Sequence, residues 1–176
     1  MFKNVSGSRG FTIVELLIVI VVIAILAAIS ITAYNGIQQR ARNTQVVAGV
    51  NTYYKALLQY KTINSTYPIH SGCLGANYPS NGCWFNGSTV SIGVNNSLDT
   101  ALAEFVPSKP TLATSVFPIG ISNYERAGLY YRYNEPTYGD VFFWYLQGIN
   151  QNCGLNGAVL SNEGGVVSQC RLSLPQ

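Results

Sequence analysis

The chain has 176 residues, of which 48% are hydrophobic, 12% aromatic and only 10% charged, and its formal net charge is +3. Two of the ten basic side chains, Lys3 and Arg9, lie in the first ten residues, so the rest of the chain has eight basic and seven acidic side chains. This near balance excludes a strong electrostatic attraction to nucleic acid or to anionic lipid.

An apolar segment follows the basic N-terminus and extends from Phe11 to Tyr34 with a single charge, Glu15. As an α-helix it would be about 36 Å long, which is enough to cross a hydrocarbon core of about 30 Å. A cleaved secretory signal has an apolar region of only about 7 to 15 residues, so this length predicts a membrane helix that is kept. Because Lys3 and Arg9 precede it, the positive-inside tendency places the N-terminus in the cytoplasm and the rest of the chain outside.

The helical pattern continues beyond the membrane segment as an amphipathic helix, because apolar residues recur there at intervals of three or four. These residues are Ile37, Ala41, Val47, Val50, Tyr54, Leu57 and Leu58. We expect the helix to end near Ile63, before the polar stretch 64–66 and Pro68. A helix of about 53 residues would be roughly 80 Å long, which suits a filament better than a compact domain.

Shorter elements are predicted for the rest of the chain. Residues 73–96 have the composition of a loop, with one alternating run at 89–94, and the next stretch predicts a short helix capped by Ser97 and ended before Pro107. The predicted strands are 128–133 and 140–146, joined by a hairpin loop, and two weaker ones at 158–160 and 166–169. The sequence therefore predicts an α+β fold in which one long N-terminal helix packs on a small antiparallel sheet of three to five strands.

Aromatic residues gather on the predicted hairpin, at Tyr130, Tyr131, Tyr133, Phe142, Phe143, Trp144 and Tyr145. Because side chains alternate between the two faces of a strand, we expect half of them to form the core against the long helix and half to be exposed. Exposed aromatic residues would suit subunit packing, or the binding of glycans, surfaces or single-stranded DNA.

The four cysteines fit an exported domain. Cys73 and Cys83 enclose one turn-rich interval, Cys153 and Cys170 enclose another, and neither pair has CxxC spacing. With His70 as the single histidine, a zinc site would need unusual ligands, so we expect disulfides and no metal site. Three pairings are possible, and we favour the two that are local in sequence.

The sequence gives little support for a catalytic function. A Ser/His/Asp or Cys/His arrangement would have to include His70, and the expected disulfides would consume the thiols. Glu135 and Asp140 flank one hairpin loop, where a salt bridge or a cap is the commoner use of such a pair. The sequence has no phosphate-binding glycine loop, so we expect no catalytic residues and no cofactor.

The stretch RGFTIVELL at residues 9–17 has an aromatic residue after a glycine, a glutamate four positions further on and an apolar helix behind it. It resembles the processing signature of type IV pilins and the related pseudopilins. The resemblance implies that a prepilin peptidase of the membrane cleaves after Gly10 and methylates the new N-terminus at Phe11. The implied domains are a removed leader at 1–10, a transmembrane and filament-core helix at 11–34, and an amphipathic helix with an extracellular head at 35–176.

Glu15 has a physical interpretation beside this resemblance. A comparable charge at the centre of a membrane helix costs about 2.5 to 3.5 kcal/mol, so intramembrane charges are usually paired or functional. Cleavage after Gly10 would create an ammonium group on Phe11, and Glu15 of one helix can meet that ammonium of a neighbouring helix shifted along the axis. We therefore expect Glu15 to act in assembly, and the alternative is a carboxylate tolerated at the membrane edge.

The resemblance implies a structural subunit of a type IV pilus, a single-pass membrane protein that polymerises into an extracellular filament for adhesion, twitching motility or DNA uptake. Its partners would be other pilin subunits, the prepilin peptidase, the assembly platform and motor machinery, the membrane before assembly, and possible DNA or host surfaces. The interval between Cys153 and Cys170 resembles the disulfide-bounded loop that pilins display, which implies a contact region. Glu163 is the only acid in that interval, which argues against the calcium loop of secretion pseudopilins.

The sequence allows two functions other than that of the main pilus subunit. One is a minor pilin or a pseudopilin of a type II secretion or competence system. It is favoured by the absence of proline between Phe11 and Tyr67, because many major pilins carry a proline late in the apolar segment. The other is a signal-anchored monomeric binding domain, which predicts no cleavage after Gly10.

Overall fold

The structure, a computed structural model, describes residues 10–87, 89–112, 117–119 and 124–176. Its elements in chain order are α1 (Ile13–Asn64), β1 (Gly72–Cys73), a 3-10 turn (Pro79–Asn81), β2 (Gly82–Asn86), β3 (Thr89–Gly93), α2 (Asn96–Leu102), β4 (Phe117–Ile119), β5 (Tyr124–Arg126), β6 (Leu129–Glu135), β7 (Gly139–Gln147), β8 (Val159–Glu163) and β9 (Val167–Ser173). Two compact units divide the chain between Gln38 and Gln39, and each is described by itself. The predicted α+β class, with a long N-terminal helix and antiparallel strands, is confirmed.

The second unit contains the last part of α1, from Gln39, and this part forms one side of the core. One stripe of its side chains is buried, at Val46, Val50, Tyr53, Ala56 and Leu57. Gly49 lies on the same stripe, where a Cβ atom would collide with the side chain of Leu112. The absent side chain therefore lets the helix approach the rest of the head closely.

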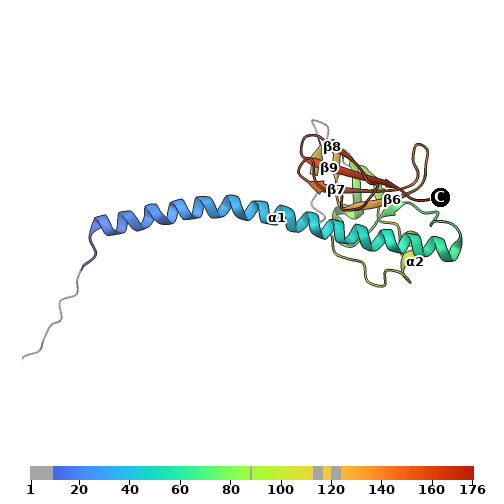
Figure 1. The fold of residues 1–176 in the computed structure, drawn as a ribbon, viewed down its shortest axis with the longest axis horizontal. Coiled ribbons are helices and arrows are strands. Elements are labelled where there is room, and N and C mark those ends of the chain that lie inside the picture. The colour runs from blue at the N-terminus through green and yellow to red at the C-terminus, as the bar shows by residue number, and fades with distance from the viewer. Residues whose placement is uncertain (1–9, 88, 113–116, 120–123) are drawn as a thin grey trace, which may run out of the picture. The chain divides into compact units, whose positions relative to one another are not determined.

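A five-stranded antiparallel sheet has the order β1-β6-β7-β9-β8, and a four-stranded antiparallel sheet has the order β3-β2-β5-β4. In the larger sheet, Leu129, Trp144 and Cys170 are paired directly across strands and so share one face. That is the face toward α1, because Gly49 lies against the Leu129 side chain. Figure 1 shows the C-terminal part of α1 running along β6, β7 and β9. The opposite face meets the smaller sheet, where the Tyr130 ring lies 5.5 Å from that of Trp84.

The expected alternation of buried and exposed aromatic residues is wrong for β7. Phe142, Phe143, Trp144 and Tyr145 are all at most 7% exposed, whereas Tyr133 on β6 and Tyr138 in the hairpin loop are 40% and 37% exposed. The reason is that both faces of this strand are covered, one by α1 and the other on the side of the smaller sheet. A strand buried on both faces shows a continuous apolar run and no period-two pattern.

Residues 73–96 form more structure than the loop expected from their composition. The run at 89–94 does form a strand, β3, but β2 and the second residue of β1 lie in the same interval. β2 is held by antiparallel pairing to β3 on one side and to β5 on the other. β1 has two residues, which pair with Tyr130 and Tyr131 of β6. Strands this short have no readable period, and β1 and β2 also pair with strands that are distant in sequence, β6 and β5.

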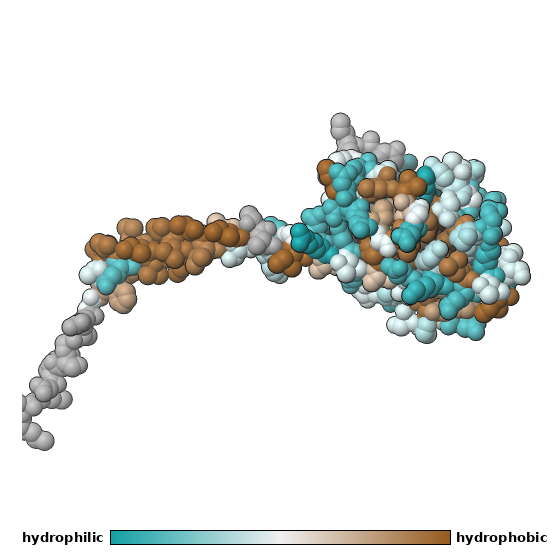
Figure 2. All heavy atoms as spheres, in the orientation of Figure 1, coloured by the Kyte–Doolittle hydropathy of each residue, from teal (hydrophilic) through white to brown (hydrophobic). Residues whose placement is uncertain are grey.

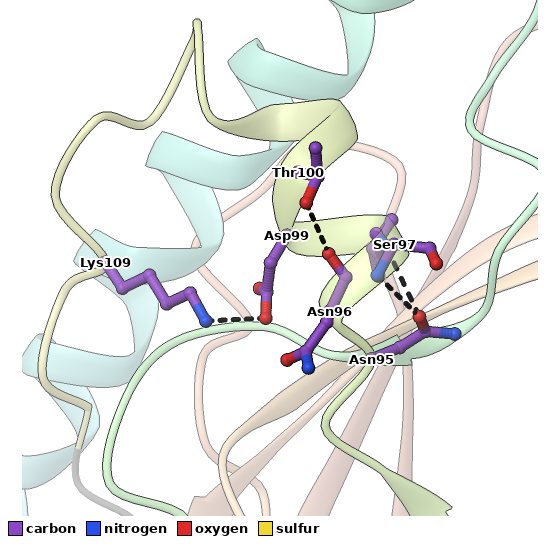
Figure 3. Close-up of polar contacts among 7 residues, drawn as sticks. Asn95, Asn96, Ser97, Asp99, Thr100 and Lys109 are labelled. Atoms are coloured by element: carbon purple, nitrogen blue, oxygen red, sulfur yellow. Dashed lines mark hydrogen bonds and ion pairs between the residues drawn. The ribbon is translucent and has the colours of Figure 1, made fainter.

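The predicted short helix is present as α2, but its cap differs from the expected Ser97. The cap is Asn95, whose Oδ1 accepts hydrogen bonds from the backbone N–H groups of Ser97 (3.0 Å) and Leu98 (3.4 Å). Figure 3 shows this arrangement. Asn is as good an N-cap as Ser, and here its Nδ2 also donates to the Ser71 carbonyl. A serine hydroxyl is too short to reach both the N–H groups of α2 and the Ser71 carbonyl. The contact with Ser71 therefore decides which residue caps the helix.

The loop that follows α2 is tied back to the helix by an ion pair. Lys109 Nζ meets Asp99 Oδ2, as Figure 3 shows. The lysine side chain is 40% exposed, so the contribution of this pair to stability is at most about 1 kcal/mol. We assign it a local role in positioning the loop.

Candidate functional site

The N-terminal segment places the predicted processing and assembly residues at the start of α1. Phe11 is 79% exposed, and Gly10 precedes it in a short non-helical stretch before the first helical residue, Ile13. Glu15 Oε2 accepts a hydrogen bond from the Thr12 backbone N–H (2.8 Å) and another from the Thr12 hydroxyl (2.7 Å). The Thr12 hydroxyl oxygen in turn accepts from the Glu15 backbone N–H at 3.3 Å.

These three contacts form a capping box, in which a threonine and a glutamate three positions later satisfy each other's free backbone N–H groups. Glu15 was predicted to act in assembly, and this second role was not predicted. The T-x-x-E spacing at Thr12 and Glu15 was a readable signal for it. Glu15 therefore stabilises the start of its own helix in a single chain, and both of the observed bonds to its carboxylate use one oxygen.

The side chains at the start of α1 are exposed from Ile13 to Ile31. The large hydrophobic residues from Phe11 to Ile31 are between 47% and 85% exposed, and Figure 2 shows this part of the helix as a hydrophobic surface. Among the described residues, α1 is the helix that is long and apolar enough to cross a membrane, by length and composition. A surface of this extent is stable when lipid or other apolar helices cover it.

Two disulfides hold the head. Cys73 pairs with Cys83, with Cα atoms 5.8 Å apart, and so links β1 of the larger sheet to β2 of the smaller one. Cys153 pairs with Cys170, with Cα atoms 5.7 Å apart, and fixes the loop after β7 to β9. Trp144 Nε1 donates to the Cys153 carbonyl at 3.1 Å, so the second disulfide is also anchored to the core. Each closed loop could contribute about 3 kcal/mol to stability.

The second disulfide encloses β8, the turn after it and the first part of β9, and exposed apolar residues lie on β8 and in the turn. Val159, Leu160 and Val166 are between 40% and 52% exposed. β8 is an edge strand of the five-stranded sheet, with all but its last residue exposed. Such an edge presents backbone groups and apolar side chains to solvent, where another molecule can contact them.

A buried ion pair joins β8 to the smaller sheet. Arg126 Nε on β5 lies 3.3 Å from Glu163 Oε2 on β8, with side chains 9% and 23% exposed. The guanidinium also lies over the Trp84 ring, 4.5 Å from its centre. Burial raises the pKa of Glu163 above its ordinary value, and the nearby Arg126 charge offsets this only in part. Burial likewise raises the pKa of Tyr145, which keeps that phenol neutral.

This raised pKa predicts a pH dependence of stability. The folded chain holds the Glu163 proton more tightly than the unfolded chain, so the free energy of unfolding falls as the pH rises from the ordinary value of 4.5 through the folded pKa. We expect the Glu163→Gln variant to lack this fall, because glutamine does not ionise. Urea unfolding of both proteins between pH 4 and pH 7 measures the difference. Parallel curves, or a wild type that gains stability relative to the variant as the pH rises, would contradict the raised pKa.

The acidic residues considered for catalysis have structural partners. Asp140 Oδ1 accepts hydrogen bonds from the Tyr131 hydroxyl and the Asn134 backbone N–H, and Glu135 Oε2 accepts from the N–H groups of Thr137 and Tyr138. Both carboxylates therefore cap the β6–β7 hairpin loop. Among the described residues, no group of three or more His, Cys, Asp or Glu side chains is arranged to hold a metal ion.

The fold and the N-terminal segment define a class of protein: a head of two antiparallel sheets carried on a long helix whose first part is apolar and exposed. Comparison with known proteins identifies the N-terminal segment. The family described as the prokaryotic N-terminal methylation motif matches residues 5–31, the stretch that contains Gly10, Phe11 and Glu15.

Three relatives illustrate what the chain is similar to. Fimbrial protein EcpC of Eikenella corrodens is 32% identical over 57% of this chain and 65% of its own length. The type IV wide pilus major component PilA4 of Thermus thermophilus is 40% identical over 39% of this chain and 52% of its own length. The type II secretion system core protein G of Klebsiella michiganensis is 38% identical over 36% of this chain and 44% of its own length.

The chain is therefore similar to type IV pilus, fimbrial and type II secretion core proteins, and its residues 5–31 match the N-terminal methylation motif. The matched region spans between 44% and 65% of the length of these relatives. Among solved structures, none matches the chain significantly.

Proposed function

We propose that the chain is a structural subunit of a type IV pilus, made as a membrane-anchored precursor and polymerised after processing. The observation that carries this proposal is the exposed apolar part of α1, with Gly10, Phe11 and Glu15 at its start. Lipid covers this surface in the precursor, and neighbouring helices cover it in the filament. The same side chains thus serve as membrane anchor and as filament core.

Processing supplies the change between these two states. Cleavage after Gly10 removes the leader at 1–10 and leaves a methylated ammonium group on Phe11, in the apolar segment 11–34. In the precursor, Glu15 is engaged by Thr12 through the capping box. In the filament, the carboxylate of Glu15 pairs with the Phe11 ammonium of an adjacent subunit, where the low-dielectric surroundings strengthen the attraction. Residues 35–176 then form the outer helix and the exported head.

A role as a minor pilin or a pseudopilin is the second candidate. It is supported by the helical conformation of α1 throughout Ile13–Asn64, with no proline before Pro68, and by the similarity to type II secretion core protein G. In either role the partners are other pilin subunits, the prepilin peptidase and the cytoplasmic motor machinery. Catalysis is not part of the proposed function.

Intact mass spectrometry of sheared surface material tests the proposal. We expect a chain that begins at methylated Phe11, recovered in bulk, whose mass rises on reduction by one hydrogen for each of four cysteines. A processed chain found only in the membrane fraction would support the second candidate. An uncut chain with residues 1–10 in cells that have active prepilin peptidase would refute both and leave a signal-anchored monomeric domain.

A further inference from the structure

A groove opens between the two sheets of the head, beside the strands β1, β2, β3 and β6. Its volume is about 430 Å³, and its lining includes Ser71, Trp84, Asn86, Ser91, Ile92 and Arg132. This volume lies in the range of sites that hold small molecules, roughly 300 to 1,000 Å³. The lining combines an aromatic side chain and a guanidinium with amide and hydroxyl groups, and the described lining residues include no carboxylate.

The walls of the groove are held in place from both sides. Trp84, half-buried on β2, packs against Tyr130 of β6 with ring centres 5.5 Å apart and against the Arg126 guanidinium at 4.5 Å. The disulfide between Cys73 and Cys83 links the strands β1 and β2, which belong to opposite walls. A groove fixed in this way before binding loses little conformational entropy when a ligand enters.

Arg132 supplies a cation at the rim. Its side chain is 36% exposed. Among the described residues it forms one long ion pair, in which Nη1 lies 3.9 Å from Glu135 Oε1. The other oxygen of Glu135 is occupied by the backbone N–H groups of Thr137 and Tyr138. A guanidinium has five N–H donors in a planar fork, so Arg132 retains donors for a carboxylate that arrives from solvent.

Neutral polar groups complete the lining. Ser71 Oγ accepts a hydrogen bond from the Tyr133 backbone N–H at 2.9 Å, and its own hydroxyl hydrogen is then positioned to donate. Asn86 and Ser91 are exposed and offer both donors and acceptors. The indole of Trp84 and the side chain of Ile92 provide apolar surface beside these groups. The site therefore matches a ligand with one negative charge, several hydroxyl groups and an apolar C–H face.

We propose that this groove binds an acidic saccharide, with the sugar carboxylate on Arg132, hydroxyl groups on Asn86 and the two serines, and the C–H face against Trp84. A nucleic acid strand fits less well, because it requires a positively charged groove that follows a backbone of repeated phosphates. Among the described residues that line this groove, Arg132 alone is positively charged. Binding is a property of the head of one chain and does not depend on polymerisation.

The two tryptophans allow a direct test by NMR on the full-length chain in detergent micelles. Trp84 lines the groove, whereas Trp144 is fully buried and donates its indole N–H to the Cys153 carbonyl. With indole-labelled tryptophan, titration with sialyllactose is expected to shift the Trp84 signal and leave the Trp144 signal in place. The Trp84→Phe variant assigns the two signals. We expect saturation with a dissociation constant of about 1 mM or tighter.

Arg132→Gln is expected to weaken sialyllactose binding about tenfold or more, because a charge-assisted pair to the carboxylate is lost. Lactose, which lacks the carboxylate, should bind the wild type about tenfold or more weakly than sialyllactose does. The matched control is Arg171→Gln on β9, whose guanidinium lies over the Tyr138 ring outside the groove. This variant should bind sialyllactose within twofold of the wild type. Thermal unfolding of both variants establishes that each is folded.

Three results would overturn the proposal. The first is a Trp84 signal that does not move at saturating sialyllactose. The second is an equal loss of binding in Arg132→Gln and Arg171→Gln, which would indicate non-specific charge attraction. The third is a short oligothymidine that shifts Trp84 with the same dependence on Arg132 when sialyllactose does not, which would assign the groove to nucleic acid. None of these results would affect processing at Gly10, so this proposal can fail separately from the pilus subunit function.

Discussion

Replacing Glu15 by glutamine is expected to leave a processed but unassembled protein in the membrane. Glutamine keeps a side-chain oxygen that can accept the two hydrogen bonds from Thr12, so the capping box at the start of α1 is preserved. It has no charge, so the Phe11 ammonium of a neighbouring subunit is left buried without a partner. Breaking a buried pair in this way costs roughly 3–5 kcal/mol, which corresponds to a loss of filament of about a hundredfold or more.

The measurement compares the amounts of the chain in sheared filaments and in membranes, with the N-terminal mass as evidence of cleavage. Glu104→Gln is the matched control, since it removes the same charge from an exposed position after α2. We expect it to assemble like the wild type. Normal filament yield for Glu15→Gln would mean that capping is the whole role of Glu15. A failure to cleave would mean that Glu15 acts at processing instead.

Trp144→Ala is expected to be the most destabilising single change in the head. The side chain is 0% exposed, lies on the face of β7 toward α1 and donates its indole N–H to the Cys153 carbonyl. Truncating a buried tryptophan costs about 3–5 kcal/mol, and the Cys153 carbonyl also loses its partner. For a chain of this length, the melting temperature should fall by roughly 10 °C.

Thermal and urea unfolding, followed by circular dichroism on the full chain in detergent, provide the measurement. Tyr133→Ala is the comparison on the neighbouring strand β6, because its side chain is 40% exposed. We expect that variant to lie within about 0.5 kcal/mol of the wild type. A loss below about 1 kcal/mol for Trp144→Ala would show that the β7 core is loosely packed or can rearrange around the missing ring.

The long helix was the most predictable element. Its apolar stretch, the three-to-four spacing beyond Gly36 and the breakers after Ile63 are local signals, and the structure ends α1 at Asn64. The strands β6 and β7 were also predicted, because they are long and are separated by a loop with proline and glycine. The candidate residues at the N-terminus, Gly10, Phe11 and Glu15, came from a contiguous motif. Their roles in processing and assembly stay predictions.

Features that depend on distant partners could not be read in the same way. The smaller sheet is built from strands of three to five residues, too short to show a period. Asn95 replaced Ser97 as the cap of α2 because its carboxamide also reaches the Ser71 carbonyl. The ion pair between Arg126 and Glu163 joins residues 37 positions apart, from two different sheets. Spacing along the chain carries no signal for such a contact.

The sequence by itself determined the division of this protein into an apolar helix, its amphipathic continuation and a cysteine-bearing head, because composition and helical period are local properties of the chain. Tertiary structure alone decided how the head is closed. It placed a second sheet over the face of β6 and β7 that alternation would have left exposed, and it created the groove at Trp84 and Arg132. Burial and cavities arise from the packing of segments that are far apart in sequence, so only the folded chain defines them.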